Sequence, residues 1–439
     1  MHTSAPSDRG SSEAVWDPVE TAPREPLREL QLERLRVTVE RSIAGQPPIA
    51  SRLAEAGITD AREISSLDDL ARLPHTRKTD LRDHYPFGLL AVPREQVVRV
   101  HASSGSHGKP TVVGYTRADL DAWTELMARC MTMAGVRPGM VVHNANGYGL
   151  FTGGLGFHYG GERIGATVVP VSGGFTARQA MLLSDLCGEA LCATPSYALV
   201  IGQAIRDAGL DPDDLPLRIG LFGGEPWTEE MRRQLDSELG MSAVNFYGLS
   251  EMCGPGVAAE CLDARDGLHV QEDHFLVEVI DPESGEPVPE GADGELVFTT
   301  LMKEGQPLIR YRTGDIGAIS TEPCRCGRTT ARITSLRGRL DDMLIIRGVN
   351  LFPSNIETLL LEVEDVGPHY RLIVERPGDM DEVSVECEPA GPAVDRVALG
   401  ERLESLLRDH TGIRIPVSVV EPGGVPRSEG KAVRVIDRR

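Results

Sequence analysis

The sequence predicts an α/β protein: a large N-terminal domain with parallel sheets that includes a small β-rich subdomain, followed by a small α+β domain. Three observations support this fold class. Short β-rich runs alternate with helix-length segments from about residue 96, a turn-rich hairpin pattern covers about 275–335, and the last hundred residues mix two helices with two strands. A chain of 439 residues is also too long for one ordinary core, so more than one domain is expected.

The N-terminal domain is expected to span residues 25–338. Strand–helix–strand order at the observed spacing implies parallel strands joined by crossover helices. The predicted strands are 97–100, 141–143, 166–170, 190–193, 219–222 and 243–246, and the predicted helices are 117–134, 177–187, 197–208 and 229–239. Residues 275–335 form the β-rich subdomain, with turns predicted at Asp281–Gly285 and Glu290–Gly294.

The C-terminal domain is expected to span residues 339–439, with a boundary at Arg337–Asp342. Its predicted helices are 354–362 and 394–411, and its predicted strands are 371–375 and 382–388. At the other end, residues 1–24 are expected to be a disordered leader. They are rich in Ser, Pro, Asp and Glu and hold no apolar run of the secretory kind, which predicts a cytoplasmic protein.

Charge and composition exclude several kinds of partner. The chain has 45 basic and 66 acidic residues and a net charge of −21, so neither nucleic acid nor an anionic membrane is an expected partner. The longest apolar runs are far shorter than a membrane span. The eight cysteines predict no disulfide framework, and four of them are expected to be buried: Cys130, Cys187, Cys192 and Cys387.

A glycine-rich segment, His101–Thr111, follows a predicted strand. Glycine and small residues let backbone N–H groups turn towards an anion, serine hydroxyls add donors, and Lys109 adds a positive charge. These properties suit a phosphate-binding loop, although the Gly-x4-Gly-Lys-Ser/Thr spacing of a P-loop is absent. Taken alone, the segment is equally compatible with a polar surface loop.

Four later segments occur in an order that favours the phosphate-binding interpretation: Gly223-Gly224-Glu225-Pro226, Phe246–Glu251, Arg310–Asp315 and Ser428–Lys431. With the glycine-rich loop, they resemble the ordered core motifs of the adenylate-forming superfamily. Within it the chain resembles the phenylacetate–CoA ligase family from about residue 15 to its end. The segments that carry this closer resemblance are Leu150–Gly160, Ala193–Tyr197, Glu225–Thr228 and Asp341–Asn350.

The resemblance implies ATP, Mg²⁺ and CoA as ligands and a small aromatic carboxylic acid as substrate. Its implied product is an acyl-adenylate that is then converted to a thioester. The implied catalytic residues are Lys431, Glu251 and Lys109, with Glu251 also holding Mg²⁺. The implied ATP- and AMP-binding residues are Ser103, Ser104, Gly105, Ser106, Gly108, Gly223, Gly224, Glu225, Pro226, Phe246, Tyr247, Gly248, Ser250, Asp315 and Arg339.

Individual roles follow from the same resemblance. Tyr247 would stack on adenine, Asp315 would accept hydrogen bonds from the ribose hydroxyls, and Lys431 would neutralise the acid carboxylate and the α-phosphate. The C-terminal domain is expected to be mobile, with Asp341 as its hinge and Arg347-Gly348 in the loop that reaches the CoA side. On the sequence alone, Lys431 also fits a solvated lysine and Asp341 an ordinary turn residue.

The resemblance also implies which residues bind the aromatic acid: Tyr148, Phe151, Gly153 and Gly154. A flat pocket of glycines and aromatic edges suits a benzoate- or phenylacetate-like ring. Core packing is the competing explanation for aromatic residues in this region.

One position departs from the family pattern. The family's phosphate loop usually carries two threonines where this chain has Ser106-His107. An enzyme that stops at the adenylate, or passes it to a carrier protein or an amine, is therefore an open alternative. A zinc-stabilised nucleotide-binding regulator without catalysis is a second alternative, which the presence of Lys431 and Asp315 disfavours. Family members are often dimers, so a homodimer is also open.

A structural zinc site is expected from four residues. Cys324 and Cys326 form a Cys-x-Cys pair, and Cys261 and His269 lie in a second loop. Together they supply a Cys3His set, which fills a tetrahedral zinc site without an open position. The alternative is a group of reduced cysteines with an incidental histidine.

Overall fold

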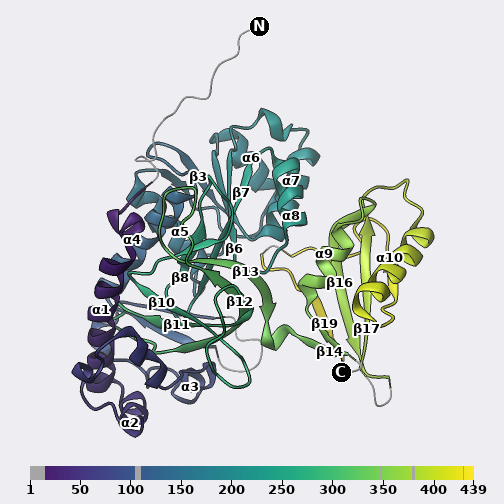
Figure 1. The fold of residues 1–439 in the computed structure, drawn as a ribbon. Coiled ribbons are helices and arrows are strands. Elements are labelled where there is room, and N and C mark those ends of the chain that lie inside the picture. The colour runs from purple at the N-terminus through teal and green to yellow at the C-terminus, as the bar shows by residue number, and fades with distance from the viewer. Residues whose placement is uncertain (1–14, 104–109, 347–348, 378–380, 429) are drawn as a thin grey trace.

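The computed structural model describes residues 15–103, 110–346, 349–377, 381–428 and 430–439. Its main feature is a sheet of eleven strands in the order β10-β11-β12-β13-β9-β8-β7-β6-β5-β3-β4, seen at the centre of the larger domain in Figure 1. A smaller domain with a separate four-stranded sheet follows, in the order β18-β17-β16-β19. The predicted α/β class, with a large sheet domain and a small C-terminal α+β domain, is confirmed.

One half of the large sheet is parallel. Its strands are β3 (Val141–Asn144), β4 (Thr167–Val169), β5 (Ala190–Ala193), β6 (Ile219–Gly223) and β7 (Ser242–Leu249). The helices between them are α5 (Gly153–Ile164), α6 (Thr176–Asp185), α7 (Pro195–Asp207) and α8 (Glu229–Leu239). Helix α4 (Arg117–Met133) precedes this half. The crossover pattern expected from residue 141 to residue 246 is therefore present.

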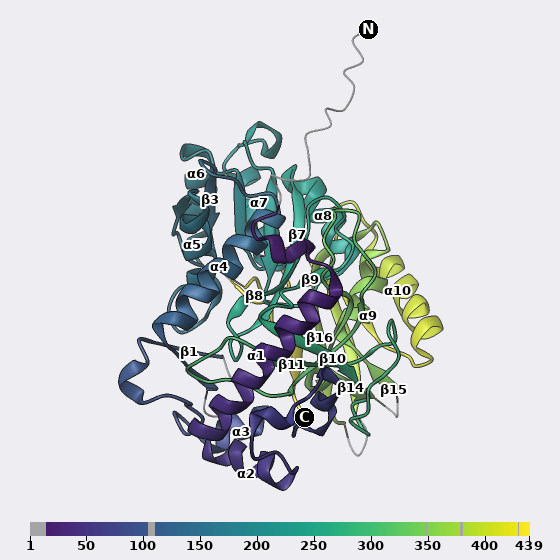
Figure 2. The ribbon, with the colours of Figure 1, turned by 60° about the vertical axis from the view of Figure 1, so that its left-hand side comes forward.

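The other half of the sheet is antiparallel and starts where β7 pairs with β8. Its strands are β8 (Gly254–Glu260), β9 (Leu268–Val270), β10 (Phe275–Ile280), β11 (Gly294–Thr300), β12 (Tyr311–Ser320) and β13 (Arg332–Arg339). The hairpin pattern of 275–335 thus continues the same sheet. Figure 2 shows α1 (Arg24–Gly45) crossing this half, where its side chains bond to Glu272, Asp273 and Thr300. Helices α2 (Pro47–Glu55) and α3 (Lys78–Asp83) follow α1.

The strand predicted at 97–100 was wrong in both bounds and partner. The observed strand is β1 (Arg99–Ala102), and it pairs antiparallel with β2 (Val112–Tyr115) in a separate two-stranded sheet. The two strands flank the glycine-rich segment, so local hairpin pairing outcompetes a place in the parallel series. Cys187 is exposed instead of buried, because it lies with a φ of 53° in the turn after α6.

Helix α5 was not predicted, because glycines at 153, 154, 156, 160 and 161 are unfavourable in a helix interior. Their packing explains them. A Cβ at Gly160 would lie 2.6 Å from the Met127 Cβ, and one at Gly156 would lie 2.9 Å from the Trp123 ring. Both neighbours belong to α4, so the glycines allow α4 and α5 to approach closely. Tertiary packing here overrides local propensity.

The C-terminal elements pack around a hydrophobic core of their own, which includes Leu360, Leu372, Val385 and Leu403. They are β14 (Leu344–Ile346), β15 (Val349–Leu351), α9 (Pro353–Leu361), β16 (Val366–Glu375), β17 (Glu382–Pro389), α10 (Arg396–Thr411), β18 (Val417–Val419) and β19 (Val435–Asp437). Helix α9 contacts α8 and β13 of the large domain. Within the described residues, no helix is both long and apolar enough to cross a membrane.

Candidate active site

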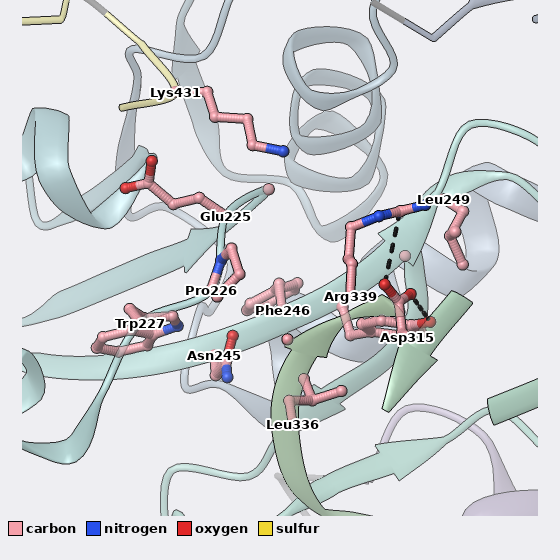
Figure 3. A pocket seen from close by; sticks show the side chains of 14 residues that line it. Glu225, Pro226, Trp227, Asn245, Phe246, Leu249, Asp315, Leu336, Arg339 and Lys431 are labelled. Atoms are coloured by element: carbon pink, nitrogen blue, oxygen red, sulfur yellow. Dashed lines mark hydrogen bonds and ion pairs between the residues drawn. The ribbon is translucent and has the colours of Figure 1, made fainter. Parts of the chain in front are cut away.

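A pocket lies at the carboxyl ends of β6 and β7, where parallel α/β sheets usually bind ligands. Strands β12 and β13 form a second wall, and Lys431 reaches in from the C-terminal domain (Figure 3). Nine lining residues were predicted from the sequence: Gly224, Glu225, Pro226, Phe246, Tyr247, Gly248, Asp315, Arg339 and Lys431. Five others were not assigned to the site: Trp227, Asn245, Leu249, Leu336 and Gly338. Each of these five is close in sequence to an assigned residue, which was the available signal.

Asp315 is the centre of a short polar chain in this pocket. Strand β12 pairs with β13 in a register that sets Asp315 opposite Arg339, and their side chains approach to 3.5 Å. The Tyr247 hydroxyl donates a hydrogen bond of 2.6 Å to Oδ2 of Asp315. Burial raises the pKa of the Tyr247 phenol, so the hydroxyl keeps its proton as a donor. The Asp315 carboxylate is therefore held in one orientation by three strands.

Glu251 lies on the turn between β7 and β8, and its side chain is buried. Its carboxylate accepts a hydrogen bond of 3.3 Å from the Tyr311 hydroxyl. The buried ammonium of Lys303 donates to the carbonyl oxygens of Glu251, at 2.6 Å, and of Met252. Beside it, the Tyr115 hydroxyl donates to the Ser250 carbonyl at 2.9 Å. The turn that carries Ser250 and Glu251 is thus held by three buried side chains from other strands and loops.

Lys303 was not identified from the sequence as part of the site. Its Nζ lies 4.7 Å from the centre of the Tyr115 ring, a cation–π contact. Burial lowers the pKa of Lys303 to about 8. No local motif marks this lysine, because its partners come from residues 115, 251 and 252.

Several predicted site residues lie outside the described part of the chain. They are Ser104, Gly105, Ser106, Gly108 and Lys109 of the glycine-rich loop, with His107, and Arg347 and Gly348. The side chain of Asp341 is likewise outside it, although its backbone belongs to the 3-10 turn Leu340–Asp342. Ser103 is described, and its backbone N–H donates to the Thr111 carbonyl at 3.0 Å.

The residues expected to bind the acid lie on the loop before α5 and in its first turn. Asn144 donates to the Tyr148 hydroxyl at 2.9 Å and to the Gly154 carbonyl at 2.7 Å, which closes the loop. Burial raises the pKa of Tyr148 to about 12. Phe151 is 52% exposed, so it does not belong to the core of the described structure.

The predicted zinc residues converge on one point. The ligand atoms of Cys261, His269, Cys324 and Cys326 all lie within 4.8 Å of one another. The Cys261 and Cys324 sulfurs are 3.8 Å apart, and the Cys326 sulfur is 3.5 Å from Nε2 of His269. The second ring nitrogen of His269 lies 3.0 Å from the Thr330 hydroxyl, which orients the imidazole.

The sequence of this chain matches two family models and several known proteins. Residues 37–301 match the AMP-binding enzyme family and residues 348–439 match the AMP-binding enzyme C-terminal domain. The phenylacetate-coenzyme A ligase of Thermus thermophilus is 51% identical over 96% of this chain and 98% of its own length.

Solved structures of 2-hydroxyisobutyryl-CoA ligase share the fold. The form in the postadenylation state with 2-HIB-AMP has a TM-score of 0.91 at 31% identity, covering 100% of this chain and 94% of that one. The form in the thioesterification state with 2-HIB-AMP and CoA has a TM-score of 0.72 at 32% identity, covering 96% and 91%. As a whole, the structure of this chain is therefore more similar to the postadenylation form. Both family matches, and the 51% identity over nearly the whole chain, show that this chain belongs to the phenylacetate–CoA ligase family of AMP-binding enzymes.

Proposed function

We propose that this protein is an ATP-dependent aryl acid:CoA ligase. In the first step an oxygen of the acid carboxylate attacks the α-phosphorus of ATP, and the bond to pyrophosphate breaks. In the second step the CoA sulfur attacks the acyl carbonyl, its proton is lost, and AMP leaves. The observation that carries the proposal is the meeting of Lys431 with Tyr247, Asp315 and Arg339 in one pocket of a chain with phenylacetate-coenzyme A ligase relatives.

The proposed roles follow from the geometry. The Lys431 ammonium points into the pocket (Figure 3), where a positive charge would offset the repulsion between the acid carboxylate and the α-phosphate. The oriented Asp315 carboxylate would accept hydrogen bonds from both ribose hydroxyls. The Tyr247 ring would stack on adenine, with Gly223, Gly224 and Phe246 around it, while the serines and glycines of the phosphate loop and Lys109 would hold the leaving pyrophosphate.

Mg²⁺ would neutralise phosphate charge when bound. Glu251 suits a role in holding it, because a carboxylate is a hard oxygen donor and this one is fixed by Tyr311 next to Ser250. For the second step, rotation of the C-terminal domain about Asp341 would remove Lys431 and bring Arg347 and Gly348 towards the CoA thiol. The higher similarity to the postadenylation form is consistent with the described arrangement serving the first step.

The substrate is proposed to be a small aromatic acid, bound through Tyr148, Phe151, Gly153 and Gly154. A suitable test measures acid-dependent pyrophosphate release over a panel of aryl and aliphatic acids, with and without CoA, and identifies the product by mass. The expected result is AMP, pyrophosphate and an aryl-CoA thioester. Acid-dependent pyrophosphate release that gives no thioester when CoA is present would overturn the ligase assignment in favour of transfer to an amine or a carrier protein. The homodimer and the cytoplasmic location expected from the sequence remain predictions.

We also propose that Cys261, His269, Cys324 and Cys326 bind one structural Zn²⁺. Tetrahedral bonds of about 2.3 Å to sulfur and about 2.05 Å to nitrogen require S···S separations of about 3.8 Å and S···N separations of about 3.6 Å. The two corresponding distances in this chain are 3.8 Å and 3.5 Å. With four protein ligands the ion would have no open position, which supports a structural role.

A further inference from the structure

The carboxylate of Glu225 connects the two domains. Its Oε1 accepts a hydrogen bond of 2.7 Å from the backbone N–H of Ser196, in the first turn of α7. Its Oε2 accepts one of 2.7 Å from the backbone N–H of Ala432, the residue after Lys431. The N–H groups of a first helical turn have no partner within the helix, so Ser196 offers a fixed donor that orients the carboxylate. The remaining oxygen is then directed at the C-terminal domain.

The other side of Lys431 is held as well. The Thr194 hydroxyl donates to the carbonyl of Gly430 at 3.0 Å, and the Ser196 hydroxyl lies 3.5 Å from the same oxygen. The backbone groups of both residues that flank Lys431 are therefore bonded to the large domain. These contacts come from Ala193–Tyr197 and Glu225–Thr228, two of the sequence segments that carry the closer family resemblance.

Glu225 lines the proposed nucleotide pocket, but its carboxylate bonds to backbone groups outside that pocket. Figure 3 shows its carboxylate turned away from Asp315 and Arg339, while the Lys431 side chain extends into the pocket. Hydrogen bonds from N–H groups to a carboxylate are stronger than those between neutral groups. In the described part of the chain, this carboxylate accepts hydrogen bonds from two backbone N–H groups, and the one from Ala432 joins it to the C-terminal domain.

We propose that Glu225, assisted by Thr194, is a positioning residue that holds the lysine loop (Gly430, Lys431 and Ala432) at the pocket for adenylation. This inference rests on the proposed function and adds to it a device that favours one of the two domain arrangements. Interfaces between domains of one chain are commonly modest and polar, so a few bonds bias the balance between arrangements. The bonds to Gly430 and Ala432 break when the C-terminal domain rotates, which makes Glu225 irrelevant to thioester formation.

The test compares Glu225→Gln, Thr194→Val and wild type in the two half-reactions. Glu225→Gln retains one acceptor oxygen for two donors, and Thr194→Val removes the hydroxyl at nearly constant volume. Glu229→Gln is the matched control, because Glu229 is exposed and its carboxylate accepts hydrogen bonds from Arg232 on the same helix, α8. Adenylation is followed by acid-dependent ATP–pyrophosphate exchange, and the second step by thioester formation from prepared acyl-AMP and CoA.

Both test variants are expected to slow exchange by roughly tenfold, the effect of losing one charge-assisted or buried hydrogen bond. Thioester formation from acyl-AMP should stay within about twofold of wild type or become faster. Hydrogen exchange followed by mass spectrometry supplies a readout that needs no activity. The amide of Ala432 should lose protection in Glu225→Gln and keep it in Glu229→Gln.

Two results would overturn the proposal. An equal loss in both half-reactions, together with weaker AMP binding, would mean that Glu225 contacts the nucleotide. Unchanged exchange with unchanged protection of Ala432 would mean that its carboxylate does not hold the loop. A wild-type chain that exchanges no pyrophosphate with any acid would instead overturn the proposed function, and the protection of Ala432 would still decide the role of Glu225.

Discussion

The Tyr247 hydroxyl and the Asp315 carboxylate are joined by a hydrogen bond of 2.6 Å across the pocket, between the parallel and antiparallel halves of the sheet. The residue proposed to stack on the base is thereby connected to the residue proposed to bind the ribose. A nucleoside that enters this pocket meets a carboxylate that is already oriented, so less ordering is needed on binding.

This relationship predicts that Tyr247→Phe weakens AMP binding while leaving the fold intact. The variant retains the ring but removes the donor that orients Asp315. The expected loss is about fivefold to tenfold in affinity, the range for one buried hydrogen bond. Isothermal titration calorimetry with AMP provides the measurement. Tyr159→Phe, outside the pocket, serves as control, and equal affinities for wild type and Tyr247→Phe would refute the prediction.

Lys431→Ala is predicted to separate the two half-reactions. This substitution removes the positive charge that lies beside the reacting carboxylate and phosphate, so ATP–pyrophosphate exchange should fall by about a hundredfold or more. Thioester formation from prepared acyl-AMP should change little, because the lysine leaves the site when the domain rotates. A comparable fall in both steps would show that Lys431 serves the fold or both reactions.

The proposed zinc site predicts both the zinc content of the purified protein and a contribution of the ion to its thermal stability. The purified chain should contain about one zinc ion per molecule, and Cys326→Ser should lose it. Loss of a four-ligand structural ion is expected to lower the thermal midpoint by roughly 5–10 °C. Elemental analysis and differential scanning calorimetry measure the two effects. Cys187→Ser, at an exposed cysteine outside the cluster, is the matched control and should alter neither.

Lys303 predicts a pH dependence of stability. Burial lowers the pKa of Lys303 to about 8, whereas an unfolded lysine titrates near 10.4. Below pH about 8 Lys303 is protonated in both the folded and the unfolded state, and the folded state is destabilised by the full cost of burying its charge. Between the two values the unfolded state binds more protons, so stability rises with pH.

Lys303→Met removes that titration. From about pH 7 to about pH 9.5, the free energy of unfolding of wild type should rise by roughly 2 kcal/mol relative to the variant. Urea unfolding at the two pH values provides the comparison. Parallel pH profiles for the two proteins would contradict the assignment of this pKa to Lys303.

Local pattern predicted much of the fold. The strands of the parallel half and helices α4, α6, α7 and α8 lie close to their expected positions, because a run of β-branched residues between turns, or an apolar repeat of helical period, depends on neighbours in sequence. Helix α5 and strand β8 were not predicted, because their local sequence does not favour a helix or a strand. Their glycine and proline residues disfavour regular structure locally, and only packing against α4 and pairing with β7 and β9 compensates.

The candidate site divides in the same way. Short motifs in the sequence predicted nine residues that line one pocket, and its cysteine and histidine positions predicted four residues whose side chains converge on one point. What the sequence by itself determined is therefore the chemistry available: a lysine, two carboxylates, glycine-rich loops and a Cys3His set. Only the tertiary structure decided how these groups are oriented and held. Glu225 and Ala432 are hydrogen-bonded although they are 207 positions apart. Lys303, in the loop after β11, is hydrogen-bonded to Glu251, in the turn between β7 and β8. Such contacts arise because sheet topology and domain docking bring distant backbone groups within hydrogen-bonding range, and no local pattern encodes that distance.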